Sequence, residues 1–413
     1  MPIDFTFTKE QVALKMQVRE FVDTVAKPIA DEIDRTRRFP HEIINGLADM
    51  GLLCPVVPKE WGGSGLSYVD YAIIAEEVGR GDAGAATVMG AICSLTAVPI
   101  LMYGTQDQKE RYLPKLARGE WVGAFALTEP QAGSDSGKTL VSIKPLDEAG
   151  TRYAVNGHKI WTTNGDMADL ILVFCTSDPS KGVAGITPVL VERTMKGFSS
   201  GRIEETVGIH GSHQVDTFYE DVEIGEEQIL GGKAYIGKGF RVAMGTLDGG
   251  RVGVAAVSCG IAQQALDEAI EHAKTREQFG KPIAENQSIS FRLADMATRL
   301  HAARLMTYHA AWMKDMNIPN TYQSAQAKLY ASEAAWWITD QALQIFGGWG
   351  YTRTYPAERH LRDARIKLIY EGTSEIQRLV ISRTLLKQGA YDFGITFNPL
   401  EEEAQKELAG VAG

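Results

Sequence analysis

Residues 359–377 read RHLRDARIKLIYEGTSEIQ. Ser374 and Gln377 have the spacing of a capping box, in which side chains satisfy the free backbone N–H groups of a first helical turn, so a helix is predicted to begin there. Glu371 then lies on the turn before the helix, and Gly372 allows that turn an unusual backbone conformation. A carboxylate in this place can project into a cavity, although a solvated glutamate ahead of a helix would show the same sequence.

The predicted helix closes a long region of helical periodicity. Between residues 261 and 273, apolar side chains recur three to four residues apart, and charged side chains lie on the opposite face. The segments 288–316 and 321–346 show the same period. Four helices joined by modest connections predict a C-terminal four-helix bundle over residues 237–390, followed by a peripheral extension over residues 391–413.

The chain ahead of this bundle divides into a helical part and a β-rich part. A capping box at Thr8 and Gln11, followed by apolar residues at helical spacing, predicts a helical N-terminal domain over residues 1–120. Short β-rich runs bounded by turn residues predict a middle β-sandwich or barrel domain over residues 121–236. The predicted strands cover residues 121–127, 152–161, 169–176, 185–192 and 214–224. An α+β fold with three domains suits a chain of 413 residues, since one core rarely serves more than ~250–300 residues.

Composition narrows the classes of partner and site. The net charge of −10, from 42 Lys and Arg against 52 Asp and Glu, disfavours nucleic acid and anionic lipid surfaces as partners. An anionic ligand would need a local cluster of arginines. Cys54, Cys93, Cys175 and Cys259 are far apart in apolar stretches, which predicts buried free thiols and a reducing compartment. No metal is expected, because the histidines form neither an HExxH motif nor a Cys/His cluster.

The chain is predicted to be cytoplasmic and to have no membrane span. Its first ten residues show no basic segment followed by an apolar run, so no signal peptide is expected. Residues 83–106 carry no charge and are long enough to cross a bilayer. They are rich in small residues, however, and Pro99 interrupts them, which favours a buried core helix.

Two strand ends carry residues suited to a flat, hydrogen-bonding ligand. Residues 125–135, FALTEPQAGSD, run from a strand into a loop that offers backbone N–H groups and the Thr128 and Ser134 hydroxyls, which fits a flavin. Residues 161–165, WTTNG, place an indole beside small hydroxyls, which suits an isoalloxazine ring. Both are also ordinary turn sequences, one at a β-turn and one at a hairpin corner.

Two arginines are predicted near helix ends, where phosphate groups bind well. The stretch Asp248-Gly-Gly-Arg251 is predicted to begin a helix, and Arg276 to end one. Surface salt bridges would account for both arginines equally well. Residues 346–351, FGGWGY, form a glycine-rich turn after a long helix, which either lets a ligand approach the backbone or merely ends the helix.

The order of these motifs resembles the acyl-CoA dehydrogenase family. TEPQAGSD, IWTTNG, LDGGR, REQFG, QIFGGWGY and RDARIKLIYEGTSEIQR follow one another as in that family, and the last is most similar to the short-chain, butyryl-CoA branch. The resemblance covers about residues 5–388. It implies the same order of helical, β and four-helix domains. It also implies a homotetramer with FAD at a subunit interface, so that each active site borrows residues from a neighbour.

The resemblance assigns residues to three groups. Those implied to lie at or near the flavin within one subunit are Phe125, Leu127, Thr128, Gly133, Ser134, Trp161, Thr163, Thr373 and Glu375. Those implied to reach the pyrophosphate and adenosine from the adjoining subunit are Arg276, Phe279, Gln344 and Gly348. Those implied to bind the substrate are Asp248 and Arg251 toward the CoA moiety, Tyr370 beside the acyl pocket, and Ser134 and Gly372.

The chemistry implied is α,β-dehydrogenation of an acyl-CoA thioester. Glu371 would take the α-proton while the β-carbon delivers hydride to flavin N5, giving a trans-2-enoyl-CoA. The electrons would then pass to an electron-transferring flavoprotein. The branch implies a short acyl group, and branched or small cyclic groups stay open. The pocket floor is expected from Met89, Ala91, Ser94, Leu95 and Val98.

Some features depart from the family's pattern, and other activities stay open. His210 stands where an arginine is common, Trp349 replaces a usually smaller residue, and the tail beyond Gln388 is longer. A non-redox binding or scaffold protein would share the fold and bind no FAD. An enoyl-CoA reductase would run the reaction backwards, and an acyl-CoA oxidase would pass the electrons to oxygen.

Overall fold

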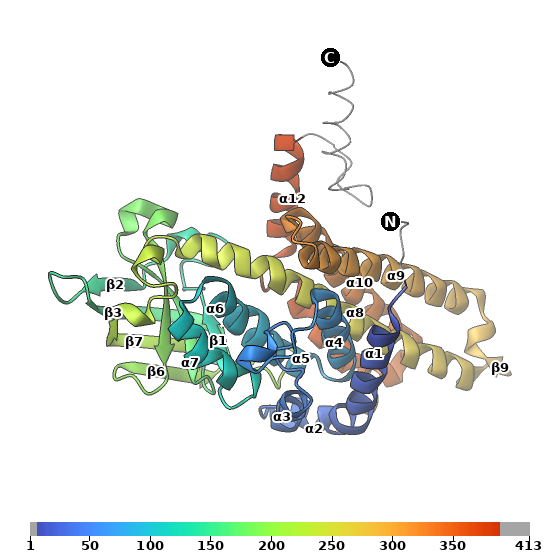
Figure 1. The fold of residues 1–413 in the computed structure, drawn as a ribbon. Coiled ribbons are helices and arrows are strands. Elements are labelled where there is room, and N and C mark those ends of the chain that lie inside the picture. Colours follow the sequence, from blue (N-terminus) through green and yellow to red (C-terminus); the bar gives the residue numbers. More distant parts are fainter. Residues whose placement is uncertain (1–5, 389–413) are drawn as a thin grey trace, which may run out of the picture.

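The computed structural model describes residues 6–388 and arranges them as helices, a sheet, and then longer helices along the chain (Figure 1). The sheet lies at one end, and the long helices α8 (Gly239–Thr275), α9 (Gln287–Asp315) and α10 (Thr321–Phe346) extend away from it. This order of domains confirms the predicted fold class. The predicted extension over residues 391–413 lies outside the described residues.

The N-terminal domain is helical, as predicted. Its helices are α1 (Lys9–Phe21), α2 (Lys27–Thr36), α3 (His41–Asp49), α4 (Tyr68–Gly81), α5 (Ala83–Ile92), α6 (Val98–Tyr103) and α7 (Gln106–Ala117). The predicted capping box of α1 is present, because the Thr8 hydroxyl accepts from Gln11 N and the Gln11 side chain accepts from Thr8 N. A second box at Ser67 starts α4, which packs on α8.

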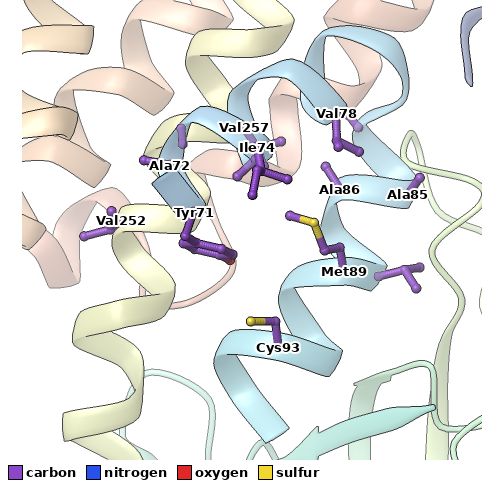
Figure 2. Close-up of a cluster of buried hydrophobic side chains, with 14 of the residues drawn as sticks. Tyr71, Ala72, Ile74, Val78, Ala85, Ala86, Met89, Cys93, Val252 and Val257 are labelled. Carbon is purple, nitrogen blue, oxygen red and sulfur yellow. The ribbon is translucent and has the colours of Figure 1, made fainter. Parts of the chain in front are cut away.

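The uncharged segment forms one helical run, Ala83–Tyr103, made of α5, a π-helical turn over Cys93–Ala97, and α6. Its 21 residues and hydropathy of 1.9 would suit a membrane helix, but 72% of its most apolar window is buried inside the fold. Its Met89 and Cys93 lie in a buried cluster with Tyr71 of α4 and Val252 of α8 (Figure 2). The segment therefore serves as the central core helix.

The middle domain is one curled sheet. Its strands are β1 (Gly123–Ala126), β2 (Ser142–Pro145), β3 (Arg152–Thr163), β4 (Leu170–Thr176), β5 (Ile186–Glu192), β6 (Phe198–Ile203) and β7 (Gln214–Gly225). Their order is β1-β4-β2-β3-β7-β6, with β5 paired to β4. All five predicted runs form strands. The sequence missed β2 and β6, which are short and largely accessible and therefore show little apolar alternation.

The C-terminal bundle is formed by α8, α9, α10 and α12 (Ser374–Gln388), and α11 (Ala357–Arg365) joins its last two helices. A small hairpin, β8 (Glu277–Gln278) and β9 (Lys281–Pro282), follows α8. The prediction that Asp248 begins a helix is wrong, since α8 begins at Gly239. The glycines that suggested a helix start, Gly249 and Gly250, are buried positions inside α8, and a Cβ atom at Gly250 would overlap Oε2 of Glu371.

His210, which departs from the family's pattern, joins the three domains. Its Nδ1 lies 2.9 Å from the Asp34 carboxylate of α2, and its Nε2 lies 3.0 Å from the carbonyl oxygen of Thr206. Arg362 of α11 pairs with the same carboxylate at 2.8 Å. Because both ring nitrogens face acceptors, the hydrogen bond to Asp34 raises the pKa of His210. This histidine is a buried structural residue with its polar atoms in use.

The cysteines form no disulfide, and metal-ligating side chains do not gather in the described residues. Cys54, Cys93, Cys175 and Cys259 are all free and buried, as predicted. Across residues 6–388, no group of three His, Cys, Asp or Glu side chains could hold a metal ion.

Candidate active site

Glu371 lies on a left-handed turn between α11 and α12. Its φ is +52°, which is costly for a residue with a side chain, and Gly372 follows at +94°. Gln377 Nε2 donates to the carbonyl oxygens of Glu371 at 3.2 Å and of Gly372 at 2.9 Å. Lys328 Nζ donates to the same Gly372 oxygen at 2.8 Å. Buried donors on α10 and α12 therefore hold the strained turn in place.

The helix after this turn begins at Ser374 as predicted, but its cap differs from the prediction. The Thr373 hydroxyl accepts from Ile376 N at 3.3 Å, so Thr373 is the capping residue. The predicted Ser374–Gln377 box is wrong, because the Gln377 side chain turns back to the two carbonyls before the helix. The inward turn of Gln377 gives the base its support.

The Glu371 carboxylate points into the protein against α8. A Cβ atom at Gly250 would overlap Oε2 of Glu371 and would lie 3.2 Å from Cδ2 of Leu95. Oε2 is buried and has no hydrogen-bond partner among residues 6–388, although Glu371 as a whole keeps some accessible surface. A buried carboxylate oxygen that accepts no hydrogen bond is suited to accepting a proton from a ligand.

Positive charges around the carboxylate partly offset the effect of burial on its pKa. Burial raises the pKa of Glu371 to about 7, against the opposing effects of Lys328, Arg251 and Lys367. Arg251 is 4% exposed and pairs with Asp248 at 2.7 Å, and Asp248 also accepts from the Thr321 hydroxyl at 2.6 Å. Arg251 therefore makes no surface salt bridge. Its Nε has no partner in the described part of the chain and remains available to a ligand.

A buried ion pair between Lys159 of β3 and Glu129 holds the loop that follows β1. Lys159 of β3 donates to the Glu129 carboxylate at 2.7 Å and to the carbonyl oxygen of Leu127 at 3.0 Å. Glu129 also accepts from Leu140 N and Val141 N. The pair fixes the backbone that carries Leu127 and Thr128, while Phe125 lies on β1 and Gly133 and Ser134 lie in the exposed part of the loop.

The end of β3 offers an uncovered aromatic surface. Trp161 has a left-handed φ of +58° and is 55% exposed, which is unusual for an indole. Beside it, Thr163 donates to the Gln214 side chain at 2.8 Å. Around Gly133, the described residues place no atom within 4 Å of where a Cβ would stand. An open indole beside an open loop with hydroxyl and backbone donors fits a flat isoalloxazine ring.

The other predicted flavin residues lie at the opposite end of the bundle. Arg276 caps α8, Phe279 is 97% exposed, and the turn with Gln344 and Gly348 is close to both, since Phe346 stacks on His272 at 4.2 Å. With 37 residues, α8 is about 55 Å long. In one chain, β9, which follows Arg276 and Phe279, lies at the opposite end of the molecule from β3, which carries Trp161 (Figure 1). Their exposure agrees with contact across a subunit boundary.

The residues expected at the floor of the acyl pocket all lie on the helical run Ala83–Tyr103, and most of them are buried. Met89, Ala91, Ser94 and Val98 are buried in the core, and only Leu95 of the expected residues keeps accessible surface. Thr87, Gly90 and Leu95 form the partly accessible stripe of this helical run.

Lys159→Met is expected to release FAD. It removes one partner of a buried ion pair, which costs about 3–5 kcal/mol, and it takes the Lys159 donor away from both Glu129 and Leu127 O. The loop under the isoalloxazine site should then loosen. The measurement is the flavin-to-protein ratio after gel filtration, with the surface variant Lys144→Met as control. Full flavin retention by Lys159→Met would contradict this role of the ion pair.

Comparison with known families now identifies the class of protein. Models for the N-terminal, middle and C-terminal domains of acyl-CoA dehydrogenase match residues 8–120, 124–222 and 237–386 in that order. The chain therefore belongs to the acyl-CoA dehydrogenase family and is an oxidoreductase of a family whose members use FAD.

The relatives point to the short-chain branch. The short-chain specific acyl-CoA dehydrogenase of Clostridium acetobutylicum is 42% identical over 385 residues, covering 93% of this chain and 100% of the relative. The acryloyl-CoA reductase (NADH) of Anaerotignum propionicum is 42% identical, covering 94% and 97%. The butyryl-CoA dehydrogenase structure from Megasphaera elsdenii matches with a TM-score of 0.90 and 42% identity, covering 93% of this chain and 100% of that one. The predicted similarity to this branch is confirmed.

Sequence reasoning missed several residues around the base. Lys328 and Lys367 both have a relative exposure of 0%, yet in sequence they look like ordinary polar positions. Gly250 stood inside the motif LDGGR, but its contact with Glu371 joins residues more than a hundred positions apart. Nothing in the local sequence marks these positions.

Proposed function

We propose that this enzyme dehydrogenates a short-chain acyl-CoA thioester between its α- and β-carbons, with Glu371 as the base. The observation that carries the proposal is the buried Oε2 of Glu371, which has no hydrogen-bond partner within residues 6–388. Glu371 itself lies on a left-handed turn that Lys328 and Gln377 hold by hydrogen bonds. Structural carboxylates at such burial are normally satisfied by donors. A carboxylate held without one is suited to take a proton from the substrate.

The proton transfer needs a base of raised proton affinity, since an ordinary carboxylate is a poor match for the α-C–H of a thioester. Burial supports this role, because it raises the pKa of Glu371 to about 7. An acyl chain along Thr87, Gly90 and Leu95 would exclude water further. Asp248 and Arg251 would bind the CoA part, and Tyr370 and Gly372 would flank the reacting carbons.

FAD is the proposed cofactor. Phe125, Leu127, Thr128, Gly133, Ser134, Trp161 and Thr163 would hold its isoalloxazine part, with Thr373 and Glu375 nearby. Bound FAD supplies the acceptor for the β-hydride. The exposed Trp161 indole and the open loop around Gly133 support this assignment. An electron-transferring flavoprotein is the proposed acceptor of the electrons.

The proposed assembly is a homotetramer. Arg276, Phe279, Gln344 and Gly348 would reach the pyrophosphate and adenosine of a neighbour's FAD. Their position at the far end of α8 supports this arrangement, as does the 97% exposure of Phe279. Exposed apolar side chains on α9, including Phe291 and Trp312, offer further surface for subunit contact.

The test is anaerobic addition of butyryl-CoA to the purified protein. A yellow protein whose flavin absorbance bleaches supports the dehydrogenase. A colourless protein indifferent to CoA esters would contradict it and favour the scaffold function. Repeating the titration with branched and cyclic acyl-CoAs defines the acyl group, and repeating it in air separates an oxidase from a dehydrogenase.

The second candidate is an enoyl-CoA reductase that runs the same chemistry backwards. Similarity to the acryloyl-CoA reductase of Anaerotignum propionicum favours it, at the same 42% identity as the dehydrogenase relative. Measuring both directions with one substrate pair, butyryl-CoA and crotonyl-CoA, decides which direction is faster.

The rate of flavin reduction is expected to depend on pH through Glu371. The base must be a carboxylate, so kcat/KM for butyryl-CoA should rise with pH and level off above about 7, the pKa of Glu371. Below that value it should fall about tenfold per pH unit. Stopped-flow measurement across this range tests the expectation, with circular dichroism as control for unfolding. A flat profile would contradict it.

A further inference from the structure

Two buried lysines flank Glu371 in space, and each bonds one of its sequence neighbours. Lys328 of α10 donates from Nζ to the carbonyl oxygen of Gly372 at 2.8 Å. Lys367 donates from Nζ to the hydroxyl of Tyr370 at 2.6 Å. Both lysines have a relative exposure of 0%. The base thus sits between two residues that are each held by a buried ammonium group.

Other helices complete this support. Lys367 also donates to the Thr87 hydroxyl of α5 at 3.1 Å, which fixes its position relative to the core helix. Gln377 of α12 donates to the same Gly372 oxygen as Lys328. The left-handed backbone at Glu371 needs such support, because a non-glycine residue at φ +52° would relax if its neighbours were free.

A buried ammonium group is costly unless an opposite charge lies near it, and Glu371 is one of the carboxylates that favour the charged form of both lysines. The charged groups that face Lys328 are Glu371, Arg251, Glu375 and Glu333. Those that face Lys367 are Asp363, Glu371, Asp82 and Lys328. Those that face Glu371 are Lys328, Arg251 and Lys367, with Tyr71 and Tyr370 beside it.

Lys328, Arg251 and Lys367 all favour the carboxylate form of the base, and of these three cations Arg251 also pairs with Asp248. Burial lowers the pKa of Lys328 to about 8 and that of Lys367 to about 7, because the charged ammonium form is disfavoured inside the protein. Glu371 opposes both shifts.

Resting on the dehydrogenase function proposed above, we propose that Lys328 and Lys367 form a two-lysine clamp that positions Glu371 and favours its carboxylate form. They are positioning residues and act through Gly372, Tyr370 and the electric field at the base. The clamp has two separable parts, the hydrogen bonds to the neighbouring residues and the positive charge.

Variants of the FAD-loaded enzyme separate these parts. Lys328→Gln and Lys367→Gln keep an N–H donor and lose the charge, whereas Lys328→Met loses both. We expect each glutamine variant to move the midpoint of the kcat/KM pH profile for butyryl-CoA upward by about one unit and to recover the wild-type plateau at high pH. Lys328→Met should show the same shift and a plateau lowered by about tenfold. Lys274→Met, an exposed lysine paired with Glu271 on α8, is the control and should match wild type.

The outcomes are distinct. If Lys328→Met fails to fold, the glutamine variants still decide. Unshifted midpoints in both glutamine variants, or losses equal at every pH, would overturn the clamp. That result in an enzyme whose wild-type form turns over butyryl-CoA leaves the proposed function intact. A wild-type protein whose flavin is reduced by no acyl-CoA would instead end the proposed function and the clamp with it.

Discussion

Glu371→Gln is expected to slow reduction of the bound flavin by butyryl-CoA by about a thousandfold, because a positioned general base contributes ~10²–10⁴ in rate and an amide cannot replace it. Glutamine has nearly the same shape, so the left-handed turn and the packing against Gly250 should persist. FAD content and the affinity for a CoA ester should therefore stay close to those of wild type. Stopped-flow absorbance and an equilibrium titration measure the two properties.

Glu333→Gln is the matched control for this variant. Glu333 lies on α10 and pairs with Arg378 near the surface, so the same chemical change there should leave the rate unaltered. Near-normal turnover by Glu371→Gln would refute the role of the carboxylate. Loss of FAD together with activity would show that Glu371 supports the fold, and the assignment as base would then lack its test.

Gly250→Ala is expected to lower the rate of flavin reduction by about a hundredfold, because a displacement of about 1 Å at a catalytic group has that effect. The added Cβ would overlap Oε2 of Glu371, and the flexible carboxylate would have to move. The fold itself should tolerate the change, since alanine inside a helix is favoured over glycine by about 1 kcal/mol. Thermal unfolding and stopped-flow kinetics should therefore move in opposite directions.

Gly249→Ala provides a control one position away on α8. Its Cβ would lie 3.3 Å from Cε and Nζ of Lys314, a flexible side chain that can give way. This variant should keep most of the activity. Equal activity in Gly250→Ala and wild type would contradict the position of the carboxylate described here.

Much of the fold follows from periodicity in the sequence. The helix predicted over residues 321–346 coincides with α10, because its apolar face is regular and Gly347 ends it at a positive φ. The fully buried strand β4 was predicted from its uninterrupted apolar run. These elements agree with prediction because local pattern and tertiary burial favour the same structure.

The wrong predictions concern residues whose tertiary contacts give them a role other than the one that the local sequence suggests. Gln377 has the right spacing for a cap, but it bonds the carbonyls of the Glu371 turn instead. The glycines of LDGGR suggested a helix start, yet they lie inside α8, where Gly250 makes room for the Glu371 carboxylate. Each departure lies at or beside the proposed site, where function competes with regular structure.

Whether a site residue could be predicted from the sequence depends on how far away its structural partners lie. Glu371 and Gly372 could be singled out because an acid, a glycine and a helix start stand together in sequence. Lys328 and Lys367 could not, since their burial depends on how α10 and α5 pack around the turn. Residues such as Arg276 and Phe279 gain a function only from a second subunit, which one chain's fold does not display.

Exchange of the substrate's α-hydrogens tests the central claim most directly, because it separates proton removal from hydride transfer. The substrate is an acyl-CoA analogue with sulfur in place of the β-carbon, so that no hydride can leave, and the solvent is deuterium oxide. Mass spectrometry should find deuterium at the α-carbon with the wild-type enzyme and about a thousandfold slower incorporation with Glu371→Gln. Equal rates of incorporation by the two proteins would mean that another group removes the proton.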